Sequence, residues 1–239
     1  MSGDLIDTTE MYLKTVFELR EAGVAPMRVR IAERLGHSGP TVSQTVARME
    51  RDGLLHLDHD RQIRLTDEGR RIATEVMRKH RLAERHLLDV IGLDFALVHE
   101  EACRWEHVMS LEVERRIAQQ LTPPYLDPYG NPIPGLRQLG ITETAVTPPG
   151  KDEANPLIPL GELDLGEEPV AVRIERIGER AQSDPGLLAE LARHGLVPGA
   201  PATASSTGRA LLLTGRGSDA LPIDDIAAGQ ILVTLMSAQ

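Results

Sequence analysis

The chain has 239 residues, a formal net charge of −10 and a mean hydropathy of −0.20. Its 41% hydrophobic and 26% charged residues exclude a disordered chain, and no apolar run approaches the roughly 18 residues of a membrane span. The single cysteine, Cys103, excludes an internal disulfide, and residues 1–20 lack a signal-peptide pattern. We therefore expect a globular, cytoplasmic protein.

The negative charge is unevenly distributed along the chain. Residues 142–239 carry a net charge of −7, whereas residues 1–74 carry −1 and residues 75–141 carry −2. Within residues 27–51, five arginines oppose two glutamates. An acidic average is therefore compatible with one basic surface that binds nucleic acid.

The first predicted helix begins at Asp7-Thr8-Thr9-Glu10, because capping side chains precede an acid in the first turn. Tyr12, Leu13 and Val16 form its apolar face. Met11 projects away from the centre of that face, which is unusual for a methionine that only fills a core.

The next elements predict a helix-turn-helix. A short helix over 30–35 ends at Gly36, and Ser38 or Gly39 caps a second helix with Pro40 in its first turn. An ordinary helical hairpin with a solvated face is the alternative. The residues 54–58 and 62–65, however, predict a two-stranded hairpin directly afterwards, which favours a winged helix-turn-helix.

The face of the second helix opposite its apolar residues carries a hydroxyl, an amide and two guanidinium groups. These groups suit base edges and phosphates in a major groove. Arg61 lies at the tip of the predicted wing. The candidate DNA-binding residues are Arg28, Arg30, Ser38, Pro40, Thr41, Ser43, Gln44, Arg48, Arg51 and Arg61.

The middle of the chain has metal-ligating residue types at helical spacing. A long helix is predicted from Asp67 to about Ile91, and a second helix carries the residues from His99 to His107. The spacing predicts two neighbouring sites, one formed by His80, Glu84 and His99 and the other by Cys103, Glu106 and His107.

A metalloenzyme is the alternative interpretation of this cluster. The run His99-Glu100-x-x-Cys103 differs by one residue from the zinc-protease motif HExxH. No phosphate loop, nucleophile motif or substrate-binding feature accompanies it, so we do not expect an enzyme.

The last part of the chain is expected to be a small β domain. Residues 142–166 contain proline, glycine and charge without periodicity and are predicted to be a tether. Short strands are predicted over 170–177, 202–206, 209–213 and 231–235.

Residues 7–140 resemble the diphtheria toxin repressor / iron-dependent regulator family of bacterial transcription factors. The resemblance is carried by long runs, among them Asp7–Leu13, Ser38–Val46, Met77–Arg85, Glu101–Met109 and Gly130–Gly135. It implies a winged helix-turn-helix domain over 1–74, a helical dimerisation and metal-binding domain over 75–141, and an SH3-like domain, a small β-barrel, over 167–239.

The resemblance also implies the ligands of two metal sites. The primary site would be Met11, Cys103, Glu106 and His107, and the ancillary site would be His80, Glu84 and His99, completed by Glu179 and Gln182. It implies about two Fe(II) ions per subunit, for which Co(II), Ni(II), Zn(II) or Mn(II) could substitute in vitro. It further implies a homodimer and palindromic operators of iron-uptake genes, each of which binds one dimer or two. The apolar residues around 87–95 and near Trp105 are the candidates for the dimer interface.

Ligand chemistry separates the iron branch of the family from its manganese branch. Manganese prefers oxygen ligands, whereas thioether and thiolate ligands favour softer metals. Met11 and Cys103 therefore favour iron, with a manganese-responsive regulator of the same fold as the alternative.

Overall fold

The computed structural model describes residues 7–142, 156–208 and 210–236. The chain forms two compact units. Unit 1 comprises Met1–Ala83, Ala102–Gln119 and Pro134–Ile141, and unit 2 comprises Glu84–Glu101, Gln120–Ile133 and Thr142–Gln239. No helix of the described ranges is long and apolar enough to cross a membrane.

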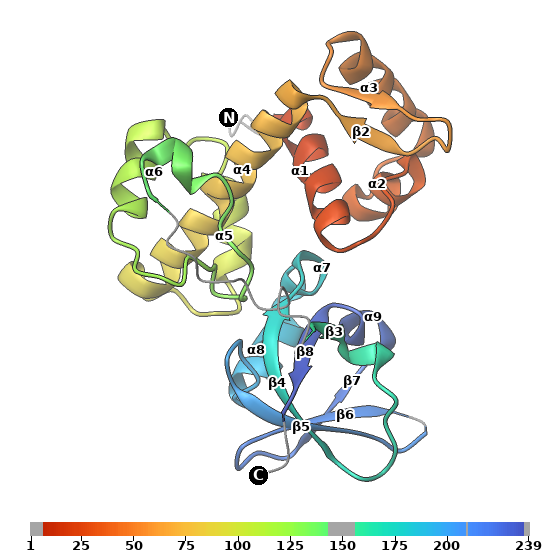
Figure 1. Cartoon of the computed structure of the whole chain (residues 1–239), viewed down its shortest axis with the longest axis vertical. Helices are drawn as coiled ribbons and strands as arrows, with labels where there is room; N and C mark the ends of the chain where they lie inside the picture. The colour runs from red at the N-terminus through yellow and green to blue at the C-terminus, as the bar shows by residue number, and fades with distance from the viewer. Residues whose placement is uncertain (1–6, 143–155, 209, 237–239) are drawn as a thin grey trace. The chain divides into compact units, whose positions relative to one another are not determined.

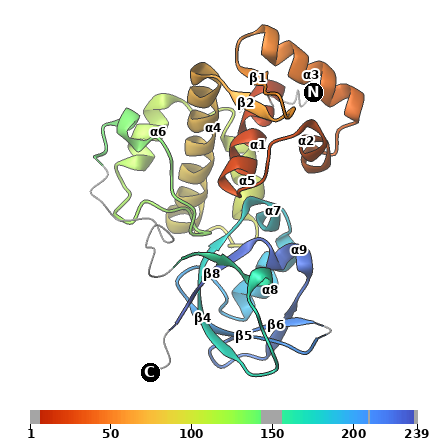
Figure 2. The ribbon, with the colours of Figure 1, turned by 45° about the vertical axis from the view of Figure 1, so that its right-hand side comes forward.

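Unit 1 begins with the predicted winged helix-turn-helix, seen in Figures 1 and 2. Asp7 accepts hydrogen bonds from the amides of Thr9 and Glu10 and so caps the first helix. The elements are α1 (Thr8–Glu21), α2 (Arg28–Leu35), α3 (Gly39–Arg51), β1 (Leu55–Leu57) and β2 (Ile63–Leu65). The prediction of a helical pair followed by a hairpin is confirmed.

A single apolar core holds these elements together. Tyr12, Leu13 and Val16 of α1 pack in one cluster with Val42 and Met49 of α3, and all five are at most 1% exposed. The burial of one face of α3 leaves its opposite face to solvent.

The predicted long helix is α4 (Asp67–His86), which continues as a π-helical turn over Leu87–Ile91 and ends at Gly92 in the left-handed conformation. It is followed by α5 (Val98–Trp105), α6 (Leu111–Ala118) and a 3-10 turn over Leu136–Leu139. In unit 1, the buried Arg78 of α4 donates to Glu114 of α6 at 2.7 Å.

Unit 2 contains a six-stranded antiparallel sheet in the order β3-β8-β4-β5-β6-β7. Its strands enclose one core together with the short helices (Figures 1 and 2). The elements are β3 (Ile158–Pro159), a 3-10 turn (Leu160–Glu162), β4 (Val170–Ile177), α7 (Glu179–Gln182), α8 (Pro185–Arg193), β5 (Pro201–Ser206), β6 (Leu211–Gly215), β7 (Ala220–Ile223), α9 (Asp225–Ala228) and β8 (Ile231–Leu235).

The structure confirms the four predicted strands as β4, β5, β6 and β8, adds β3, β7 and the helices α7, α8 and α9, and corrects two details. The strand expected over 209–213 begins at Leu211, and Arg209 lies outside the described residues. The tether expected over 142–166 is too long, because Ile158 pairs with Val233 and Leu160 is fully buried. Because Leu160 packs into the core, the tether ends before the strand that begins at Ile158. Residues 143–155 of the expected tether lie outside the described ranges.

Candidate metal centre and nucleic-acid interface

The turn between α2 and α3 is closed by local chemistry. Gly36 ends α2 at φ 65°, in the left-handed region that favours glycine, and Ser38 accepts from the amide of Thr41 to cap α3. The Tyr12 hydroxyl and His37 Nδ1 are 2.9 Å apart, which ties α1 to this turn. The geometry holds α3 against the core with its polar face outward.

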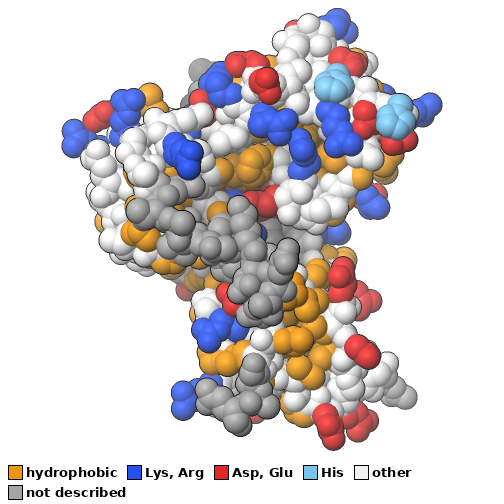
Figure 3. Space-filling view, in the orientation of Figure 1, with side chains coloured by type: hydrophobic (Ala, Val, Ile, Leu, Met, Phe, Trp, Pro, Cys, Tyr) orange, Lys and Arg blue, Asp and Glu red, His pale blue; other side chains and the backbone are white. Residues whose placement is uncertain are grey.

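Most of the expected DNA-binding residues are exposed. Arg28 and Ser43 are half-buried, whereas the remainder of the set is open to solvent, including Gln44, Arg48 and Arg51 on α3. Arg30 forms an exposed ion pair with Glu33 at 3.0 Å. Figure 3 shows several Lys and Arg side chains on the visible face of this part of unit 1. The surface suits a polyanion such as DNA.

The wing has a specific hydrogen-bonded turn. Asp58 accepts from the amides of Asp60 and Gln62 and from Arg64 Nε at 2.8 Å. Arg61 follows with φ 61°, a left-handed conformation that is uncommon for a residue other than glycine. The turn therefore places Arg61 at the exposed tip, as predicted, and the role of Asp58 was missed because it depends on the pairing of the two strands.

The residues of the expected primary site come from three segments of unit 1. Cys103 lies on α5, whereas Glu106 and His107 lie in the turn that follows the last residue of α5, Trp105. The amide of Glu106 still donates to the carbonyl of Ala102, so the helical spacing expected for this run persists into the turn. Met11 lies on α1 and is half-buried.

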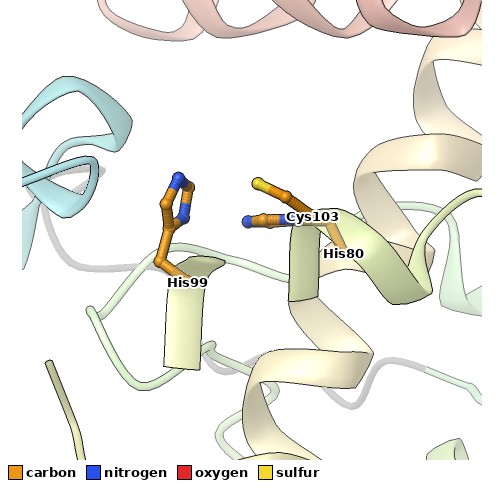
Figure 4. A group of neighbouring side chains, drawn as sticks. All are labelled: His80, His99 and Cys103. Carbon is orange, nitrogen blue, oxygen red and sulfur yellow. The ribbon is translucent and has the colours of Figure 1, made fainter. Parts of the chain in front are cut away.

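Glu106 is the centre of a buried polar cluster. Its Oε2 lies 2.7 Å from Lys14 Nζ and 2.6 Å from His80 Nδ1. The Lys14 ammonium also lies 3.1 Å from His80 Nδ1 and 3.9 Å from Cys103 Sγ. Figure 4 shows the Cys103 and His80 side chains side by side, and their ligand atoms lie within 4.8 Å of each other.

The electrostatics of this cluster favour an ionised carboxylate. Burial raises the pKa of Glu106, but the charges and hydrogen bonds of Lys14 and His80 outweigh it and lower the pKa to about 2. Glu106 is 2% exposed, so the carboxylate is a buried anion that needs a cation beside it.

His107 contacts a second acid from α1. Its Nδ1 lies 2.8 Å from Glu10 Oε2, and its Nε2 lies 3.4 Å from Glu106 Oε1. Met11 directly follows Glu10 in α1, and its carbonyl accepts from the Thr15 hydroxyl. The structure thus brings the turn of α1 that carries Met11 to the segment that carries Glu106 and His107.

The donor set fits a divalent transition metal. Thiolate, imidazole, carboxylate and thioether groups together suit iron and its neighbours. The cluster is already organised around a positive charge, because the Lys14 ammonium meets a carboxylate, an imidazole and a thiol. The residues present therefore fit a cation.

The ancillary residues of unit 2 also form a cluster. His99 Nδ1 lies 3.1 Å from Glu84 Oε1 and 3.8 Å from Glu179 Oε2. Gln182, one turn along α7 from Glu179, has a buried Oε1 without a hydrogen-bond partner among the described residues. A buried oxygen of this kind fits a cation. His80, which the sequence groups with this set, has its Nδ1 2.6 Å from Glu106 Oε2.

A turn of unit 2 contacts the end of β4, just before α7. Asn131 Nδ2 and Gln182 Nε2 both donate to the carbonyl of Ile177, the last residue of β4. Gly130 in this turn has φ 84°, and a Cβ there would lie 2.0 Å from the carbonyl oxygen of Glu175. The conformation requires glycine, and the turn connects the middle segment of the chain to the sheet.

Lys14 and Glu10 were missed from the sequence. Lys14 falls among the buried residues of α1, between Leu13 and Val16, and is 6% exposed. A lysine at a buried position is a signal in itself, because the ammonium group needs a partner there. The partner could not be named without the tertiary structure.

The fold and these clusters define a metal-responsive DNA-binding protein, and comparison with known proteins specifies the family. The model for the iron dependent repressor N-terminal DNA binding domain matches residues 4–63. The model for the iron dependent repressor metal binding and dimerisation domain matches residues 66–135. The chain belongs to the iron-dependent repressor family.

The similarity to known proteins extends over nearly the whole chain. The iron-dependent repressor IdeR of Mycobacterium bovis is 53% identical over 222 residues, which cover 92% of this chain and 94% of that protein. The diphtheria toxin repressor of Corynebacterium diphtheriae is 49% identical over 224 residues, covering 94% and 96%. A solved manganese-dependent transcriptional repressor in complex with manganese is 26% identical, with a TM-score of 0.74 and coverage of 95% and 100%.

Proposed function

We propose that this repressor is activated by Fe(II) and binds palindromic operators of iron-uptake genes in the cytoplasm. The observation that carries the proposal is the double role of α1. Tyr12, Leu13 and Val16 pack against the core beneath α3, while Glu10 and Lys14 of the same helix contact His107 and Glu106. A change in the ligand cluster therefore acts on the element that supports the DNA-reading helix.

Met11, Cys103, Glu106 and His107 would hold the primary metal, which when bound supplies a positive charge shared between α1 and the end of α5. The chain's own residues do the rest. Tyr12 and Leu13 transmit the position of α1 to the core, and Gln44 and Arg48 present an amide and a guanidinium to the groove. If iron binds better to the DNA-competent arrangement, iron and DNA increase each other's affinity.

The ancillary ligands expected from the sequence, of which Glu84, His99, Glu179 and Gln182 lie in unit 2, would hold a second metal, which makes two ions per subunit. The position of His99 Nδ1, 3.1 Å from Glu84 and 3.8 Å from Glu179, supports this assignment, as does the buried Gln182 oxygen. Anaerobic loading followed by elemental analysis should give two Fe(II) per wild-type chain. Cys103→Ala and His99→Ala should each give one, and a count of two in either variant would refute the corresponding site.

We also propose that the chain works as a homodimer, alone or as two dimers on one operator. Within the interface segment expected over 87–95, Val90 and Ile91 are 61% and 53% exposed, whereas Leu87 is buried and Phe95 packs on the core of unit 2. Exposed apolar neighbours are suited to a partner surface. Analytical ultracentrifugation of Val90→Glu/Ile91→Glu should give a monomer, and an unchanged dimer would place the interface elsewhere.

Metal dependence tests the function directly. A promoter library selected with the protein in anaerobic Fe(II) should yield a palindrome, and anisotropy with that duplex should show binding that chelation abolishes. Cys103→Ala should no longer bind the duplex when Fe(II) is added. Glu112→Gln, which changes an exposed acid on α6, should bind the duplex as the wild type does. Metal-dependent binding by Cys103→Ala at wild-type strength would refute the primary site.

A manganese-responsive repressor is the second candidate, because a solved relative of similar fold is manganese-dependent. The thiol of Cys103 and the thioether of Met11 favour iron. Repression of a reporter in cells supplied with one metal at a time distinguishes the two. Repression by manganese alone would refute the iron assignment. The proposed role needs no catalysis, and we assign none to the chain.

A further inference from the structure

Lys14 is a buried cation inside the cluster that the proposed function assigns to iron. Its side chain is 8% exposed and it lies on α1, among the apolar residues that hold this helix to the core. Burying an ammonium group is costly unless anions or hydrogen-bond acceptors surround it. Lys14 therefore occupies this position because of the groups that it meets there.

Those groups are metal-ligand types. The ammonium lies 2.7 Å from Glu106 Oε2, 3.1 Å from His80 Nδ1 and 3.9 Å from Cys103 Sγ. Two of the three, Glu106 and Cys103, belong to the proposed primary site. The ammonium thus neutralises the buried carboxylate that the metal would neutralise.

We infer that Lys14 is a built-in competitor for metal at the primary site. It stabilises the metal-free cluster, and it must leave Glu106 before the carboxylate is fully available to a metal. An alternative acceptor is already close, because Glu18 Oε1 lies 3.9 Å from Lys14 Nζ, one turn further along α1. Lys14 in this way raises the metal concentration that activates the repressor.

The inference rests on the proposed primary site and is tested with Co(II) alone. Cys103 is the only cysteine, so a cobalt–thiolate absorption band reports ligation at this site. The metal-free full-length chain is titrated against a competing chelator at one fixed pH. Lys14→Leu, which removes the ammonium without adding a ligand atom, should bind Co(II) about tenfold more tightly. This factor corresponds to about 1.4 kcal/mol, near the lower end of what one hydrogen bond to a charged group contributes.

A matched control removes the same charge elsewhere. Arg70→Leu loses one positive charge at an exposed position of α4 and should keep the wild-type affinity. Thermal unfolding of the metal-free variants shows whether each is folded, and Lys14→Ala replaces Lys14→Leu if the latter is not. Equal or weaker binding by the folded variant would refute the competition, whereas a missing thiolate band in the wild type would instead refute the proposed site.

Discussion

The ionised Glu106 should make the stability of the metal-free protein depend on acid in a defined window. Its pKa is lowered from 4.5 to about 2 by Lys14 and His80 against the opposing effect of burial. A carboxyl group whose pKa is lower in the folded than in the unfolded protein stabilises the fold. This contribution is fully present at a pH above the pKa of the unfolded state, and it is lost as the pH falls toward the pKa of the folded state. The shift corresponds to roughly 3 kcal/mol, lost at up to about 1.4 kcal/mol per pH unit.

Urea unfolding in the presence of a chelator measures this contribution. Trp105, the only tryptophan, precedes Glu106 directly and reports on this part of unit 1 by fluorescence. Glu106→Gln should be less stable than the wild type at pH 7, and the difference should shrink toward pH 2. Glu112→Gln on the exposed face of α6 should show no such window.

The double variant Lys14→Leu/Glu106→Gln separates the contribution of the ion pair to stability from the other effects of losing either side chain. Because each single variant removes one charge of the buried pair and leaves the other without its counter-charge, the double variant should be less destabilised than the sum of the two. A stability difference between the wild type and Glu106→Gln that stays constant from pH 7 to pH 3 would refute the assignment of a buried, ionised carboxylate.

Three further outcomes follow from other parts of the chain. Arg48→Ala should weaken operator binding by about 1–3 kcal/mol in anisotropy without changing the iron count, and unchanged binding would contradict its place on the DNA-reading face. Gly130→Ala should destabilise unit 2 by more than about 1 kcal/mol in thermal unfolding, because the new Cβ would meet the Glu175 carbonyl and the backbone has φ 84°. An unchanged unfolding midpoint would contradict the close approach of Gly130 to Glu175. Arg78→Met should lower the free energy of unfolding by about 3–5 kcal/mol in urea, because it leaves the Glu114 carboxylate buried without its counter-charge. The double variant Arg78→Met/Glu114→Leu should recover most of this stability, since neither charge then remains. No recovery would show that Arg78 acts through its other contacts.

Local signals predicted the DNA-reading part of the fold well. The Asp7 and Ser38 caps, the left-handed Gly36 and the hairpin after α3 all depend on neighbours within a few residues, and each appears where it was expected. Such features are encoded by short-range hydrogen bonds and backbone sterics. The exposed face of α3 followed from the same periodicity.

Weaker local signals explain what was missed in unit 2. Strand β3 is two residues long, and Leu160 lies in a segment that is rich in proline and glycine. Neither has a periodic pattern, and only pairing with β8 and burial in the core define them. The end of β4, which directly precedes α7, is likewise contacted by Asn131 and Gly130, far away in the sequence.

The sequence by itself determined the ligand types, their helical spacing and the family, because these depend on residue identity and on the geometry of single helices. Only the tertiary structure decided which groups meet. It joins His80 to Glu106 and places the Lys14 ammonium against both, and it joins Glu10 to His107. The physical reason is that a charged group selects its partner across elements 26 to 97 residues apart, a choice that no local pattern encodes.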